Sequence, residues 1–240
     1  MEPVQLTFGE ATWHLGPKSL DSMKFTLVYD DNLPSSGNKG QPVEASKIRN
    51  KLHDQLADLW NNHVVFRELK WTARTRGAQT YLTLLEPAQP PTLPDYLGEV
   101  PPLTPRQTDL CAPIEVPNVG HFIPLVRKSL YLACAVDVLF LRHEEPYELM
   151  RQGGDLDGRL KTLFDGLKMP DPKNVYRGVM PVADPLYVVL EDDALISDFS
   201  IRSGKLLGDR TKHRHAVRLT VDITIKVLRV FKQNQCLVGD

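Results

Sequence analysis

The sequence has few cysteines, and those it has are scattered. Three cysteines, Cys111, Cys134 and Cys236, occur among 240 residues, and none belongs to a C-x-x-C pair. This scarcity excludes a zinc knuckle and a disulfide framework, and it is typical of the reducing cytoplasm. The first residues, MEPVQLTFGEATWHLGP, lack the basic segment and apolar core of a signal peptide. We therefore expect a cytoplasmic protein.

Long apolar runs and nucleotide motifs are also missing. The longest apolar stretch, residues 130–141, contains Asp137 and is too short to cross a bilayer, so we expect no membrane partner. No Walker-type or dinucleotide-binding glycine motif is present, which argues against a nucleotide cofactor. The formal net charge of −1 gives no overall attraction to a polyanion. Any surface for nucleic acid must therefore be local.

The apolar residues predict strands that alternate with two amphipathic helices. Apolar side chains recur at three- and four-residue spacing in residues 43–60 and again in residues 158–168, which indicates helices. Strand-like stretches occupy residues 23–31, 78–86, 129–141, 186–193, 194–202 and 216–231. Residues 129–141 are apolar on both faces, which favours a central strand covered on both sides. We expect an α+β fold, a mixed β-sheet flanked by helices, in one domain spanning residues 1–240.

Proline is concentrated in one segment. Ten of the 19 prolines fall in residues 87–124. Proline fixes φ and lacks a backbone donor, so this segment is expected to form neither a helix nor a central strand. We interpret it as a proline-rich, extended insertion that crosses the surface. A partner-binding arm is the alternative.

Two aspartates open the second predicted helix, in the stretch GGDLDGRLKTLFDGLKMP (residues 153–170). Asp157 has the character of a helix N-cap, and Lys161 and Asp165 follow at four-residue intervals that suit ion pairs. A cap needs only one acid, however, and Asp155 adds a second that repels the first unless a cation joins them. In an extended segment before the helix, both carboxylates would point the same way.

A second acidic group follows about 35 residues later. Asp192 and Asp193 end an apolar strand that, in a mixed sheet, would lie beside the first pair. Carboxylates without histidine or cysteine suit hard ions such as Mg²⁺ or Mn²⁺. Such ions activate water and stabilise charge on a phosphoryl group, which a lysine one helical turn away also neutralises. This set of residues indicates phosphodiester hydrolysis.

The two motifs, DLDGRLKTLFDGL and LEDDALI, resemble those of the RusA-type Holliday-junction resolvases. The resemblance implies a RusA-like fold and places Asp155, Asp157 and Asp193 as metal ligands, with Asp192 beside them and Lys161 as the catalytic lysine. It also implies a homodimer that cuts branched DNA in recombination and repair. The specific match covers residues 155–196, and the LPSSGN stretch echoes a loop of the family. Gly158 stands where the family usually has asparagine, and the proline-rich segment has no counterpart there.

A local basic surface lies near the end of the chain. Residues 199–232 contain nine lysines and arginines against two acids, a balance of 9 − 2 = +7. The densest part, with Arg202, Lys205, Arg210, Lys212 and Arg214, has the composition of a loop that contacts DNA phosphates. An ordinary solvated hairpin is the alternative. For the whole chain, two other functions stay open: a non-catalytic DNA-binding relative, and a metal-dependent phosphohydrolase acting on RNA or nucleotides.

Overall fold

The computed structural model describes residues 5–8, 11–14, 23–33, 41–63, 66, 110–143, 155–173, 176–207, 216–228, 234 and 237. The strands β1 (Gln5–Phe8) and β2 (Ala11–His14) pair antiparallel as a hairpin. The other strands form one sheet of four strands and one of three, and both contain parallel and antiparallel pairs. The predicted α+β class with mixed sheets is confirmed.

The four-stranded sheet has the order β3-β9-β6-β8. Its strands are β3 (Lys24–Asn32), β6 (Leu132–Arg142), β8 (Ile196–Lys205) and β9 (Ala216–Val227). Strand β9 is antiparallel to both neighbours, whereas β6 and β8 are parallel. The apolar face expected for β9 is confirmed, because Val217, Leu219, Val221, Ile223 and Ile225 are all buried.

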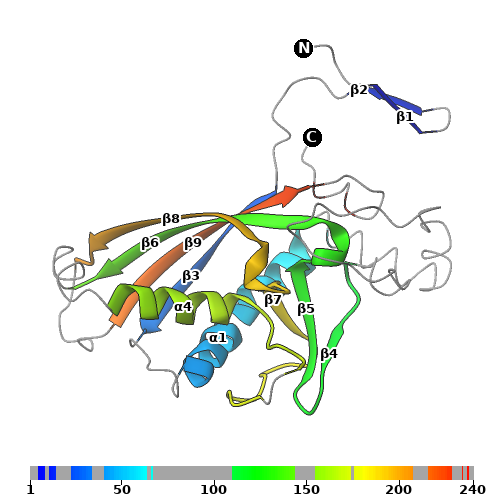
Figure 1. Ribbon diagram of the computed structural model, residues 1–240. Coiled ribbons are helices and arrows are strands. Elements are labelled where there is room, and N and C mark those ends of the chain that lie inside the picture. Colours follow the sequence, from blue (N-terminus) through cyan, green and yellow to red (C-terminus); the bar gives the residue numbers. More distant parts are fainter. Residues whose placement is uncertain are drawn as a thin grey trace.

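Both long helices, α1 (Gln41–Asn62) and α4 (Asp155–Leu167), lie on the same face of this sheet (Figure 1). The burial of β6 therefore alternates: Val136, Val138 and Phe140 are buried, whereas Leu139 and Leu141 are half-buried. Strand β6 is central, as predicted, and the two long helices among the described elements both lie on one of its faces. Among the described helices, none has the length and apolar character needed to cross a membrane.

The three-stranded sheet consists of β4 (Ile114–Val116), β5 (Gly120–Val126) and β7 (Leu186–Leu190), with β5 in the middle. The expectation that no proline of residues 87–124 lies in a central strand is wrong, because Pro124 belongs to β5 and pairs with Val188. Strand β4 pairs only with residues 120–122, so the missing donor of Pro124 costs no bond to β4. Residues 87–109, and the strand expected at residues 78–86, lie outside the described residues.

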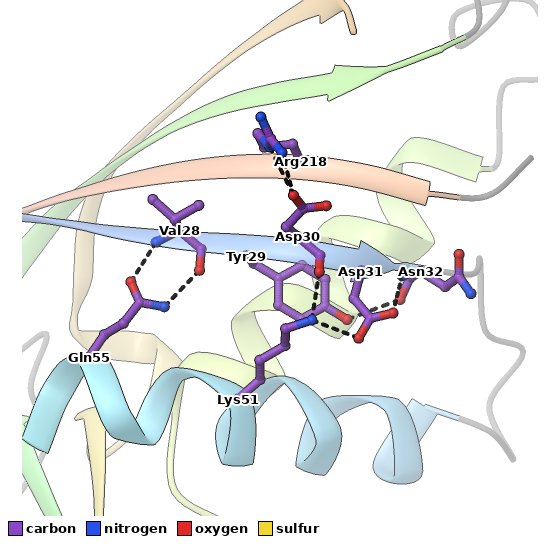
Figure 2. Close-up of polar contacts among 8 residues, drawn as sticks. All are labelled: Val28, Tyr29, Asp30, Asp31, Asn32, Lys51, Gln55 and Arg218. Atoms are coloured by element: carbon purple, nitrogen blue, oxygen red, sulfur yellow. Dashed lines mark hydrogen bonds and ion pairs between the residues drawn. The ribbon is translucent and has the colours of Figure 1, made fainter. Parts of the chain in front are cut away.

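The outer edge of β3 is closed by side chains of α1 (Figure 2). The amide of Gln55 donates to the carbonyl of Val28 at 2.7 Å and accepts from its N–H at 2.9 Å. Lys51 Nζ donates to the carbonyl of Asp30 at 2.5 Å and pairs with Asp31 Oδ2 at 2.8 Å. These contacts supply the partners that a neighbouring strand would otherwise supply.

Candidate functional site

The aspartate pair lies inside helix α4 and not in an extended segment before it. Asp155 is the first residue of the helix and Asp157 is the third. Positions two apart on a helix are about 200° apart around its axis, so they do not face each other. The expectations that Asp157 is the N-cap and that an extended segment precedes it are therefore wrong. Acids in a first turn still favour the helix, because they face its positive end.

One stripe of α4 carries Asp157, Lys161 and Phe164 and continues to Lys168, just beyond the helix. Asp157 and Lys161 are exposed. The ring of Phe164 packs edge-on against Phe199 of β8, with 5.0 Å between ring centroids. This contact places the stripe beside β8, the edge strand of the sheet.

The ion pairs expected between Asp157, Lys161 and Asp165 do not form. Among the ion pairs of the described residues, none includes Asp157 or Lys161, and Asp165 instead pairs with Lys168 at 3.2 Å. Gln41 of α1 donates to the other carboxylate oxygen of Asp165 at 2.5 Å. Asp157 and Lys161 thus remain available, one helical turn apart, at the first two turns of α4.

The second acidic group lies at the other end of the helix. Asp193 begins the short 3₁₀ helix η4 (Asp193–Leu195), and Asp192 caps it by accepting from the Ala194 N–H at 2.9 Å. Lys168 Nζ lies 2.9 Å from Asp193 Oδ2. Partial burial alone would raise the pKa of Asp193, but the hydrogen bond and charge of Lys168 outweigh it and lower that pKa. The carboxylate is therefore held ionised.

Lys168 was not among the expected site residues. Burial lowers its pKa, yet the contacts with Asp193 and Asp165 outweigh this effect and raise the pKa overall. The only sequence signal for this residue is its i,i+3 spacing from Asp165, because nothing local shows that Asp193 folds back onto it. Lys168 joins the end of α4 to the loop that precedes β8.

Arg49 of α1 fixes the same end of α4. Its side chain is buried and donates from Nε to the carbonyl of Lys168 at 2.7 Å and from Nη2 to that of Asp165 at 2.6 Å. Burial lowers the pKa of Arg49 to about 10, with Tyr176 and Asp165 opposing the shift. A cation at the last carbonyls of a helix also complements its dipole.

The two acidic motifs are thus separated by the length of α4. Asp157 and Lys168 are eleven positions apart, which corresponds to about 16 Å along the helix axis. In the part of the chain that is described, which excludes the Asp155 side chain, no group of three or more His, Cys, Asp or Glu residues is placed to hold a metal ion. A single copy does not bring Asp157 and Asp193 together, and the metal-ligand roles stay predictions.

The basic surface is described only in part. Arg202 is exposed on β8 and Lys205 is half-buried at its end, whereas Arg210, Lys212 and Arg214 lie outside the described residues. Two cations of β9 are paired with acids on the face of the sheet opposite α1 and α4, which we call the open face. These pairs are Arg218 with Asp30 and Lys226 with Asp198. The DNA-binding roles of these residues stay predictions.

Asp137 lies on this open face and not near η4. It accepts a hydrogen bond from Ser200 of β8 and is registered opposite Asp222 of β9, which accepts from Thr26 at 2.5 Å. Hydroxyl groups from both edge strands thus satisfy the two central carboxylates.

Comparison of the chain with protein-family models, with curated proteins and with solved structures found no match.

Proposed function

We propose that this chain is a RusA-like, divalent-metal-dependent endonuclease that cuts branched DNA by phosphodiester hydrolysis and works as a homodimer. One observation carries the proposal: Asp157 and Lys161 are exposed on one stripe of α4, and within the described part of the chain no ion pair involves either of them. An unpaired carboxylate and cation one turn apart match the metal ligand and the charge-neutralising lysine that phosphoryl chemistry needs.

The proposed roles follow the two motifs. Asp155, Asp157 and Asp193 would hold Mg²⁺ or Mn²⁺, with Asp192 beside them. The ion, when bound, activates water and stabilises charge at phosphorus. Lys161 would lie against the phosphate undergoing cleavage and balance its growing negative charge. Lys205 and the basic residues between 208 and 215 would hold the DNA backbone, which gives affinity that falls as salt rises.

The test is cleavage of labelled four-way junction, fork and linear duplex, with Mg²⁺, with Mn²⁺ and with EDTA. We expect metal-dependent cleavage by the wild type, its loss in Asp157→Asn, and a fall of about 100-fold or more in Lys161→Met. Asp54→Asn is the matched control, because Asp54 is an exposed aspartate on the other helix, α1.

Salt-sensitive DNA binding without cleavage under any metal would overturn the enzymatic proposal and favour the non-catalytic relative. Equal cleavage by Asp157→Asn and the wild type would overturn the assignment of the site. Equal cleavage of all three substrates would leave a nuclease but remove the preference for branched DNA.

A further inference from the structure

Strand β8 is an open edge. It pairs on one side with β6, and Figure 1 shows it at the border of the four-stranded sheet. Among the described residues, no backbone hydrogen bond reaches the outer side of residues 196–204. Phe199, on the helix-covered face of this strand, is 40% exposed. A long strand with unpaired backbone groups is a template for another strand.

The residues of β8 are complementary to themselves when the strand is reversed. In the stretch DFSIR, a second antiparallel copy centred on Ser200 sets Asp198 opposite Arg202 and Phe199 opposite Ile201. The register with β6 places Asp198, Ser200 and Arg202 on the open face of the sheet, and Phe199 and Ile201 on the helix-covered face. Opposite charges therefore meet on one face and apolar side chains on the other, which are favourable cross-strand pairs.

We propose that two copies of this chain pair antiparallel through β8, about a two-fold axis at Ser200, and join their four-stranded sheets into one continuous sheet. The contact is isologous, as closed dimers require. Each copy offers the same strand, so no second surface is needed. In this dimer Arg202 binds the partner subunit rather than DNA.

The same axis completes the site of the proposed function, and this step rests on that function. Helix α4 runs antiparallel to β8, because Phe164 contacts Phe199 and Lys168 contacts the earlier Asp193. We take Phe164 to lie level with Phe199, one residue from the axis at Ser200. The rise per residue of a helix and of a strand then places Lys168 about 9 Å to one side of the axis and Asp157 about 7 Å to the other. The two-fold rotation brings the partner's Asp157 to about the level of Lys168, whose side chain pairs with Asp193.

The two halves of the acidic site, at opposite ends of α4 in one copy, therefore come together between two copies. In this dimer Asp193 of each subunit lies toward Asp157 of the other. This arrangement accounts for the separation of the motifs in a single chain. It also makes the nuclease inactive as a monomer.

Charge reversal tests the dimer without using activity. Asp198→Arg sets arginine against the partner's arginine, and Arg202→Asp sets aspartate against the partner's aspartate, so we expect each variant alone to be a monomer of 27.1 kDa by light scattering. Mixing the two variants restores both opposite-charge pairs, so the mixture returns to twice that mass. Lys226→Met is the control, because it breaks the ion pair of Asp198 within the chain and leaves the dimer intact.

A dimer in both single variants, a monomeric wild type, or a mixture that stays monomeric would overturn the contact. Circular dichroism establishes that each variant is folded. An independent variant, Ser200→Cys, places two thiols across the axis and gives a disulfide-linked dimer on oxidation. Arg202→Cys is its matched control, because position 202 faces position 198 of the partner, so two such cysteines do not meet.

A second experiment tests the shared site, using the charge-reversed pair to force heterodimers. One mixture combines Asp157→Asn in the Asp198→Arg chain with Asp193→Asn in the Arg202→Asp chain. If each site uses both subunits, one intact site remains, so we expect about half the Mn²⁺ binding and half the cleavage of the unmutated heterodimer. Placing Asp157→Asn and Asp193→Asn together in one chain then destroys both sites.

If each site were confined to one chain, the result would be the opposite. The first mixture would show no Mn²⁺ binding or cleavage, and the second would show about half of each. That outcome would overturn the shared site and leave the dimer contact standing. Absence of both Mn²⁺ binding and cleavage in the unmutated heterodimer would instead show the failure of the proposed function.

Discussion

The two edges of the four-stranded sheet are treated in opposite ways. At β3, the amide of Gln55 occupies both backbone groups of Val28, and Lys51 occupies the carbonyl of Asp30 (Figure 2). At β8, residues 196–204 have no such partner among the described residues. One edge is closed by polar side chains of its own helix, and the other keeps its backbone free.

This difference shows that closing an edge depends on the side chains nearby and not on the strand. Both strands carry exposed charged residues, and both lie beside a helix on the same face of the sheet. The helix next to β3 provides long polar side chains directed at its backbone. The helix next to β8 provides Phe164, which packs against a ring and leaves the backbone of β8 unbonded. A sheet with one closed edge and one open edge is expected in a protein that pairs with a single second copy through the open edge.

The largest effect should come from loosening the helix that closes β3. A Cβ on Gly166 of α4 would lie 2.7 Å from Ile48 Cγ2 of α1, so the two helices would have to separate. We expect Gly166→Val to lower the free energy of unfolding by about 2–3 kcal/mol. The control at the open edge is Gly204→Val, whose Cβ meets only the tip of Leu141, and we expect a change within about 0.5 kcal/mol. Urea unfolding of both variants measures the difference, and equal losses would contradict it.

A smaller effect should come from removing the closure itself. Gln55→Leu deletes both hydrogen bonds to Val28, and we expect a loss of about 1 kcal/mol in unfolding free energy, because water reaches these groups. Gln55→Glu keeps the acceptor for the Val28 N–H and loses the donor to its carbonyl, so its loss should be smaller. Urea unfolding checks both. An unchanged free energy of unfolding in Gln55→Leu would show that water satisfies the backbone groups of Val28 as well as the amide of Gln55 does.

The smallest effect should appear in the pH dependence of the closed edge. The hydrogen bond from Lys51, followed by that from the Asn32 N–H, lowers the pKa of Asp31 below its ordinary value. A lowered folded-state pKa stabilises the protein above the ordinary carboxyl pKa, and this stability is lost as pH falls toward the folded value.

Because Lys51 and Asp31 are 41% and 53% exposed, we expect this ion pair to contribute only a few tenths of a kcal/mol. Lys51→Met should reduce the loss of stability between neutral pH and pH near 3, as measured by thermal unfolding at each pH. High salt should hide the difference. A variant with the pH dependence of the wild type would show that this pair contributes nothing.

The elements of the fold were predictable because their patterns are local. The spacing of Ile48, Leu52 and Leu56 predicts α1, and the alternation of residues 217–225 predicts β9 with its buried face. The start of α4 was not predictable, because an aspartate is equally suited to the residue before a helix and to its first turn. Pro124 in β5 was missed because its tolerance depends on how far β4 extends.

For the candidate site, the sequence supplies residue types and not their arrangement. Acidic motifs and a lysine at four-residue spacing are the basis on which phosphodiester chemistry is proposed. The pairing of Asp193 with Lys168 depends on the path of the chain after β7, which no local pattern encodes. The sequence alone also does not show that about 16 Å of helix separates the two acidic motifs.

The position of β9 governs when this protein is able to fold during its synthesis. Strand β9, at residues 216–227, lies between β3 and β6, which are made much earlier. Its pairs with β3 join residues 184 to 200 positions apart, from Asn32 with Ala216 to Lys24 with Thr224. Until β9 leaves the ribosome, β3 and β6 each lack their shared neighbour and expose apolar faces. The sheet therefore assembles only after residues 216–227 have emerged, and until then its exposed apolar faces make the nascent chain prone to aggregation.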